Sequence, residues 1–257
     1  MINKEKFSVT FTMQASALEL ALYGPIGADM FGEGITDGMV NSALKLADPY
    51  DSILLRLNSP GGDLFQGVSI YNLLKSQGKP VNVVVDGLAA SAASLIAMVG
   101  DEVVMQPGSM MMMHCAQGFC AGYSADMTKM AETLDSVTSS AADVYVLASK
   151  LSKTKVMEML VAETWMTPKE AVSLGFATQV GNGKAAKIGN QFDLRMFKNV
   201  PEELKSAEDV KLDAEIDAKT DATQVEAAVA AVKAALEAEP DPLINIFRKK
   251  LEMLRSA

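Results

Sequence analysis

Short apolar segments alternate with segments of helical spacing from residue 17 to residue 105, and this alternation limits the fold more than any other feature of the sequence. The strand-like segments are 17–23, 52–59 and 81–87, and the helix-like segments between them are 36–47 and 64–77. Residues 81–87 (VNVVVDG) are almost continuously apolar and rich in valine, which predicts a strand covered on both faces. Strands that alternate with helices predict parallel pairing and therefore an α/β domain.

The same patterns predict the remaining elements of this domain. Residues 8–13 predict a further strand, and 88–100 predict a helix of small residues. Short strands follow within 101–114, ahead of 124–162, which predict one long helix or a pair of helices. A Thr-Pro pair then opens another helix, and 176–180 predict the last strand.

The composition changes at about residue 199, which predicts a domain over 1–199 and an extension over 200–257. The extension is acidic and rich in alanine, and it contains no glycine and a single aromatic residue, Phe247. Such a segment is typical of a helical or partly disordered region. It is either a solvated tail or a segment that binds a partner.

Composition and charge exclude several classes of protein. With 49% hydrophobic residues the chain can bury a core, and with a net charge of −9 it is not expected to bind nucleic acid. The sequence contains two cysteines, Cys115 and Cys120, and a single histidine. These are too few cysteine and histidine ligands for a zinc site, so none is expected. Residues 88–99 are too short and too polar to span a bilayer, and the N-terminus lacks the apolar segment of a signal peptide. We expect a cytoplasmic protein without membrane contact, metal or cofactor.

Two segments rich in small residues end predicted strands. Residues 58–62 (NSPGG) place paired glycines where the backbone can bring its N–H groups close to a bound group, although an ordinary tight turn has the same sequence. Residues 87–91 (GLAAS) place Ser91 between a buried strand and a helix, where the next amide can donate to an oxyanion. A small-residue helix packed closely on a neighbour would look the same. The segment lacks the G-x-S-x-G pattern of α/β-hydrolases.

His114 and Glu163 are the other candidate functional residues. His114 is the only histidine of the chain, so it is the only imidazole available as a base, although a lone histidine at a strand end is often structural. Glu163 precedes a predicted helix, where its carboxylate can either cap that helix or orient an imidazole.

Taken together, these segments resemble the Clp-type serine peptidases, in the order of that family and at similar spacing. The resemblance extends over residues 17–180 and depends on NSPGG (58–62), GLAAS (87–91), MMMH (111–114) and WMTPKEAVSLGFA (165–177). The segments ELALYGPIG and ETWMTPKEA resemble most the Clp-related head maturation proteases of tailed phages.

The resemblance implies a fold and a set of roles. The fold is the spiral of βαβ units that Clp peptidases share with crotonases. The resemblance implies that Ser91 is the nucleophile, that His114 is its base, and that the backbone amides of Gly62 and Ala92 form an oxyanion hole. The third position of the catalytic triad falls on Glu163, where the family usually has aspartate; Asp143 or a backbone group are the alternatives.

The resemblance also implies protein substrates and a homo-oligomer of rings, stacked through the long helix within 124–162. The role expected is cleavage of capsid or scaffold proteins during phage head maturation. Three alternatives remain: a cellular Clp-like peptidase, a crotonase-fold acyl-CoA enzyme that uses glutamates, and a non-catalytic ring associated with a scaffold.

Overall fold

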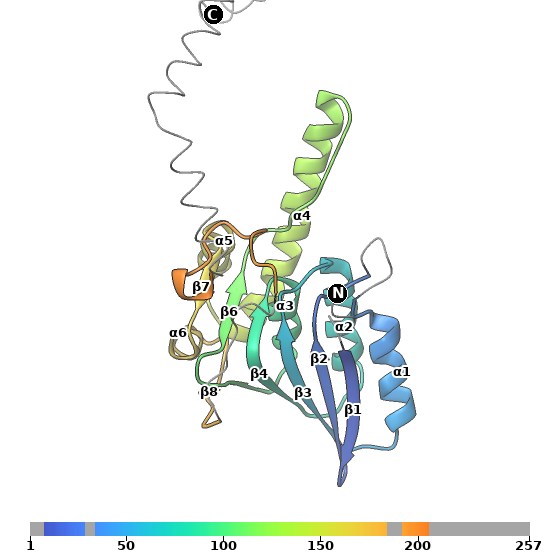
Figure 1. Ribbon diagram of the computed structural model, residues 1–257. Coiled ribbons are helices and arrows are strands. Elements are labelled where there is room, and N and C mark those ends of the chain that lie inside the picture. Colours follow the sequence, from blue (N-terminus) through green and yellow to red (C-terminus); the bar gives the residue numbers. More distant parts are fainter. Residues whose placement is uncertain (1–7, 29–33, 184–191, 206–257) are drawn as a thin grey trace, which may run out of the picture. The chain divides into compact units, whose positions relative to one another are not determined.

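A computed structural model describes residues 8–28, 34–183 and 192–205 of the chain. The strands are β1 (Ser8–Gln14), β2 (Ala17–Tyr23), β3 (Ser52–Ser59), β4 (Val81–Ala90), β5 (Glu102–Met105), β6 (Met110–Met113), β7 (Thr164–Met166) and β8 (Gln179–Val180). The helices are α1 (Asp37–Ala47), α2 (Leu64–Lys75), α3 (Ala92–Ala97), α4 (Ser124–Ser149), α5 (Lys153–Val161) and α6 (Pro168–Leu174), with a 3₁₀ helix at Glu202–Leu204. Figure 1 shows their arrangement.

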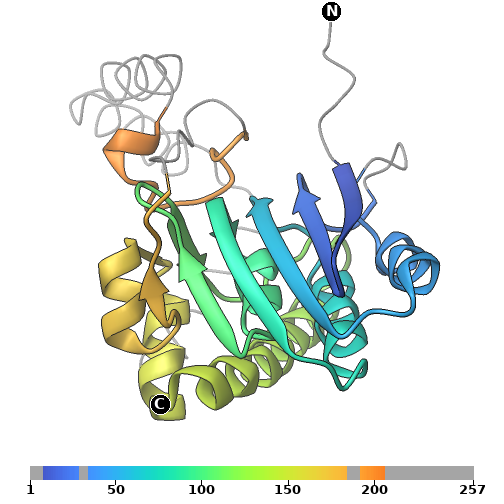
Figure 2. The ribbon, with the colours of Figure 1, turned by 90° about the horizontal axis from the view of Figure 1, so that it is seen from below.

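One mixed sheet connects all eight of these strands, and Figure 2 shows its strands side by side. Its main path is β1-β2-β3-β4-β5-β8, where β1 and β2 form an antiparallel hairpin and the other pairs are parallel. Strand β4 changes partner along its length: residues 82–85 pair with β5, and residues 88–90 pair with β6. Strand β7 pairs antiparallel with β6. The α/β fold with βαβ units is therefore confirmed.

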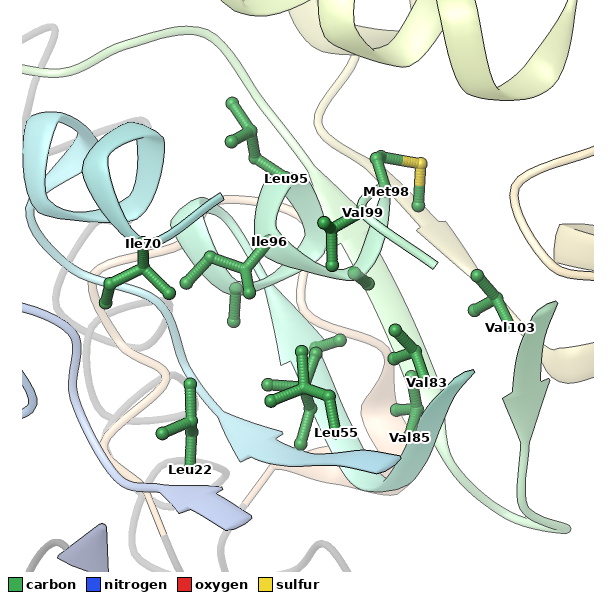
Figure 3. Close-up of a cluster of buried hydrophobic side chains, with 14 of the residues drawn as sticks. Leu22, Leu55, Ile70, Val83, Val85, Leu95, Ile96, Met98, Val99 and Val103 are labelled. Atoms are coloured by element: carbon green, nitrogen blue, oxygen red, sulfur yellow. The ribbon is translucent and has the colours of Figure 1, made fainter. Parts of the chain in front are cut away.

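Helices α2 and α3 cover one face of the sheet. Figure 3 shows Leu55 and Val83 of the sheet with Ile96 of α3 in one apolar cluster. Burial alternates strictly along β3, because every second residue points at these helices. The opposite face is less covered over the first part of β4, where Asn82 is exposed. The prediction that 81–87 is covered on both faces is therefore wrong for this part of the strand.

From Gly87 to Ala90, in contrast, β4 is buried on both faces. Leu88 and Ala90 belong to a second apolar cluster, in which the segment 192–204 supplies Leu194 and Phe197. This cluster lies beside the point where β4 moves from β5 to β6. Strand character thus continues through residue 90, and the helix predicted over 88–100 is limited to α3.

Side chains cap the starts of two helices, and for the second of them, α6, this confirms the start predicted from the Thr-Pro pair. Thr36 caps α1, and Thr167 caps α6 with Glu170 completing a capping box and Pro168 in the first turn. The segment 124–162 is a pair of helices, α4 and α5, separated at Lys150 in the left-handed region. Strand β7 was not predicted, because three residues are too few to show alternation.

The predicted extension over 200–257 lies almost entirely outside the described residues. Its first residues, up to Lys205, are described, and Val200 and Leu204 pack against the second apolar cluster. The boundary at residue 199 stays a prediction.

Candidate active site

Ser91 lies at the turn between β4 and α3 in a strained backbone conformation. Its φ of 52° and ψ of −124° place this residue in a region that L-residues rarely occupy. Four hydrogen bonds hold the turn: the Ser91 amide donates to the Met112 carbonyl, and the Ser91 carbonyl accepts from the amides of Ser94 and Leu95 and from the Ser94 hydroxyl. This conformation turns the backbone from β4 into α3 at Ser91.

His114 directly follows β6, which is the neighbour of β4 at this level of the sheet. Its Nε2 atom lies 2.7 Å from Ser91 Oγ, within hydrogen-bond distance. Because Ala90 is paired with Met112 across the two strands, the ladder itself brings the residues that follow, Ser91 and His114, to the same edge. The predicted pairing of hydroxyl and imidazole is therefore present in the structure.

Burial and charge act on the imidazole in opposite directions. The half-buried position of His114 lowers its pKa below the ordinary value of 6.5, because burial disfavours the charged form. The negative charge of Glu163 opposes this shift and raises the pKa. The imidazole is consequently neutral at pH 7, the form that can accept a proton from a hydroxyl.

The predicted oxyanion-hole residues lie in the same place. Gly62 and Ala92 line a cavity of about 380 Å³ together with Ser91 and His114. Within the described residues neither the Gly62 amide nor the Ala92 amide donates a hydrogen bond to another group. Two amides without internal partners beside a hydroxyl can stabilise a developing negative oxygen.

Glycines allow this close approach of the two segments. A Cβ atom on Gly61 would lie 2.4 Å from the Ala90 carbonyl oxygen and 2.7 Å from Ser91 Cβ. Gly62 has a φ of 141°, and a Cβ atom there would lie 2.1 Å from the Ile26 carbonyl oxygen. The NSPGG segment is therefore more than an ordinary turn, because it places two backbone segments in contact at Ser91.

The rest of the cavity is mainly apolar. Helix α4 supplies Met130, Leu134 and Val137, and the segment after β8 supplies Met196 and Phe197. The cavity lining also includes Tyr145, whose buried hydroxyl lies 2.8 Å from Ser94 Oγ. Because the Ser94 hydroxyl donates to the Ser91 carbonyl, Tyr145 donates to Ser94 and supports the turn from below.

Glu163 is buried but does not line the cavity. Its backbone has a φ of 48°, and its carboxylate accepts hydrogen bonds from the amides of Lys198 (3.0 Å) and Asn199 (2.6 Å). The indole Nε1 of Trp165 also donates to it, at 3.4 Å. Among the described residues, His114 forms one hydrogen bond, to Ser91, so Glu163 affects the imidazole through its charge.

Helix capping does not account for the Glu163 carboxylate, since Thr167 is the residue that caps α6. Asp143, the alternative acid, lies on the exposed side of α4. There its Oδ1 atom is 2.7 Å from Lys153 Nζ, so its charge is paired away from the imidazole.

Sequence reasoning missed three contributors: Phe197, the amides of Lys198 and Asn199, and the Ser94–Tyr145 pair. The apolar residues of FDLRMF (192–197) were the one available signal that this segment packs on the sheet. A local sequence pattern shows neither which group accepts a hydrogen bond from a backbone amide nor that two residues 51 positions apart form a pair.

Within the described residues no group of three or more His, Cys, Asp and Glu side chains is placed to hold a metal ion. None of the helices seen in those residues combines the length and the apolar character that a membrane crossing needs.

A hydroxyl, an imidazole and two backbone amides around one cavity form the arrangement of hydrolases that act through a nucleophile. Comparison with known proteins identifies the family: residues 9–184 match the sequence profile described as Clp protease. The chain belongs to the Clp protease family and is thus a peptidase, that is, a hydrolase.

Individual relatives agree with this assignment. The chain is similar to "ATP-dependent Clp protease proteolytic subunit 1" of Protochlamydia amoebophila, with 30% identity over 143 residues, which is 54% of this chain and 69% of the relative. It is 30% identical to the protein of the same name in Chlamydia abortus over 155 residues, 56% of this chain and 81% of the relative. The "ATP-dependent Clp protease proteolytic subunit" of Deinococcus radiodurans is 27% identical over 139 residues, 53% and 68% of the two chains.

Proposed function

We propose that the protein is a serine endopeptidase in which Ser91 attacks the peptide carbonyl. The observation that carries the proposal is the distance of 2.7 Å between Ser91 Oγ and His114 Nε2. His114 accepts the hydroxyl proton during the attack and returns it to the departing amine, so that an acyl-enzyme forms on Ser91. Water then attacks the ester with His114 again as base, and the acid product leaves.

The amides of Gly62 and Ala92 stabilise the negative oxygen of both tetrahedral intermediates. Losing one such donor typically costs about 3–4 kcal/mol of transition-state stabilisation. Glu163 supplies negative charge that stabilises the imidazolium formed during each attack, consistent with its effect on the His114 pKa. In this proposal Glu163 is the acid of the triad, acting through its charge.

Covalent labelling tests this assignment directly. A fluorophosphonate probe should add one phosphonyl group to the wild type, located at Ser91 by intact mass and peptide mapping. Ser91→Ala should neither label nor cleave a fluorogenic peptide, His114→Ala should label far more slowly, and Ser42→Ala on the exposed side of α1 should behave as the wild type. Equal peptide turnover by wild type and Ser91→Ala would contradict the proposal.

The same experiment addresses the alternative chemistries. A crotonase-fold acyl-CoA enzyme should form no adduct at Ser91, and a non-catalytic ring should show neither labelling nor turnover. Membership of the Clp protease family favours the peptidase. Members of that family typically form oligomeric rings and act on proteins, so the assembly proposed for this chain is a homo-oligomeric ring, with α4 as the contact between stacked rings.

The biological role is proposed to be cleavage of capsid or scaffold proteins during phage head maturation, in the host cytoplasm or the prohead. The resemblance of ELALYGPIG and ETWMTPKEA to the phage branch supports this role. The alternative, a cellular Clp-like peptidase, is favoured by the relatives named ATP-dependent Clp protease proteolytic subunits. Genes for portal and capsid proteins beside this gene support the first role, whereas a neighbouring unfoldase gene supports the second.

A further inference from the structure

The segment Phe192–Leu204, here called the strap, covers the face of the sheet opposite α3 at the level of the site. It is drawn in orange in Figure 1. Its side chains Leu194 and Phe197 are buried against Leu88 and Ala90, near the end of β4 before Ser91, and against Met112, near the end of β6 before His114. The strap is therefore part of the support of both reacting groups.

Phe197 is the strap residue that reaches the imidazole. Its ring centroid lies 5.5 Å from that of His114, with an angle of 88° between the ring planes. Phe197 also contacts the indole of Trp165, with 5.8 Å between the ring centroids and 78° between the ring planes. Edge-to-face contacts of this kind favour one orientation of a ring and contribute about 0.5–1.5 kcal/mol beyond burial. The imidazole thus contacts Phe197 through its ring and Ser91 through Nε2.

Glu163 binds the strap through the two residues that follow Phe197. Its two carboxylate oxygens accept from the amides of Lys198 and Asn199, and the Asn199 side chain donates to the Ala162 carbonyl oxygen at 2.9 Å. Hydrogen bonds to a buried carboxylate are stronger than those between neutral groups. The position of Phe197 is thereby tied to a carboxylate that is 6% exposed.

We propose that Phe197 is a positioning residue for the reaction: it holds the His114 ring at Ser91, and Glu163 anchors it through the amides of the next two strap residues. This inference depends on the proposed function, in which His114 is the base. Glu163 then has two roles: its charge acts on His114, and its carboxylate anchors the strap. The strap contributes to the active site through Phe197.

A purely structural role and a positioning role differ in their effect on the imidazole. Phe197 shields His114 from water, so removing its ring should raise the pKa of His114 toward 6.5, since burial is the main cause of the lowered value. The charged and titratable groups near His114 would stay in place: Glu163 before β7, Cys115 beside it, and Asp135 of α4 and Lys198 of the strap, which act on Cys115.

The test compares Phe197→Ala and Phe197→Leu with Leu194→Ala in the full chain. Leu194 is buried in the same cluster, 7% exposed against 6% for Phe197, but it has no ring contact with His114. Two quantities are measured: kcat and KM on a fluorogenic peptide, and the pKa of the single histidine by NMR after ¹³C labelling of its Cε1. With one histidine in the chain, the signal needs no assignment.

We expect Phe197→Ala to lower kcat by about 10- to 100-fold, the range that a small misplacement of a reacting group produces, with little change in KM. Its His114 pKa should rise. Phe197→Leu, which keeps burial but removes the ring, should lower kcat by a smaller factor and shift the pKa less. Leu194→Ala should lower the melting temperature but change kcat and the His114 pKa far less than Phe197→Ala does, because it leaves the ring contact with His114 in place.

Wild-type kcat and pKa in Phe197→Ala would overturn the proposal, and so would equal changes in Leu194→Ala, since these would show general loosening of the strap. If Phe197→Ala does not fold, Phe197→Leu decides in the same way. Failure of the proposed function is recognised separately: the wild type would then not label at Ser91, whereas the NMR titration would still report the contact between Phe197 and His114.

Discussion

Ser91 and His114 are placed at the ends of two neighbouring parallel strands, whereas Glu163 precedes a strand of three residues and is bound by amides 35 and 36 positions further along the chain. On the first side, one ladder of backbone hydrogen bonds sets the distance between the reacting groups. The Glu163 carboxylate, in contrast, depends on a segment that follows the last strand of the described residues, β8. The proposed nucleophile and its proposed base are thus positioned by the sheet, whereas the proposed acid is held by a contact with a later segment.

The strongest test of the Ser91–His114 pair is His114→Ala. Loss of the only imidazole should lower kcat by about 10⁴-fold or more, because Ser91 then has no base. Hydrolysis of a fluorogenic peptide measures the change, and circular dichroism checks that the fold remains. Cys120→Ala, outside the cavity, is the matched control. Activity within tenfold of the wild type would show that another base serves Ser91.

Gly62→Ala tests the backbone segment next to the Ser91–His114 pair. The added Cβ atom would lie 2.1 Å from the Ile26 carbonyl oxygen at a φ of 141°, so the segment must shift and its amide must move. We expect kcat to fall by about 10²- to 10³-fold, the usual cost of one oxyanion donor. Gly78→Ala is the control, because no atom lies within 4 Å of its Cβ position and only backbone strain at φ 63° remains. Equal kcat values for the two variants would remove Gly62 from the oxyanion hole.

Glu163→Gln tests the role of the carboxylate, and it should lower kcat less than the two preceding variants do. Where a carboxylate bonds directly to the imidazole, its replacement by an amide costs about 10⁴-fold in kcat. Here its hydrogen bonds go to the strap, so we expect a loss of about 10- to 100-fold from the missing charge and the loosened strap. A loss near 10⁴-fold would show that Glu163 contacts His114 directly during the reaction.

The same variant has a predicted pH dependence. Activity requires neutral His114, so the rate rises with pH through its pKa and reaches a plateau above it. In the wild type burial places this rise below pH 6.5, and the charge of Glu163 limits the shift. Removing that charge should move the rise of kcat/KM to still lower pH. A move to higher pH would mean that the variant exposes the imidazole to water, as expected for Phe197→Ala.

The smallest effect is expected for Asp143→Asn. The Asp143 side chain is 60% exposed and pairs with Lys153, and exposed ion pairs contribute about 0–1 kcal/mol. Peptide hydrolysis should be unchanged, and the melting temperature should fall by a few degrees at most. A marked loss of kcat would revive Asp143 as the acid of the triad.

The sequence pattern predicted the α/β fold, and the resemblance to the Clp-type peptidases grouped Ser91, His114, Gly62 and Ala92, which the structure places around one cavity. Periodicity locates strands and helices, and in a parallel sheet the carboxyl ends of neighbouring strands meet at one edge. It was less successful where an element is short or changes partner: β7 was missed, and the strand character of 88–90 was assigned to a helix. There the second face of β4 is covered by the strap, a contact that no local pattern contains.

The sequence by itself determined where most strands and helices lie, because residue periodicity is a local property, and its resemblance to the Clp-type peptidases indicated that Ser91 and His114 meet. Only the tertiary structure decided where the Glu163 carboxylate directs its hydrogen bonds and which ring rests against His114. These features depend on amides and side chains far apart in the chain, whose meeting follows from how the strap packs on the sheet.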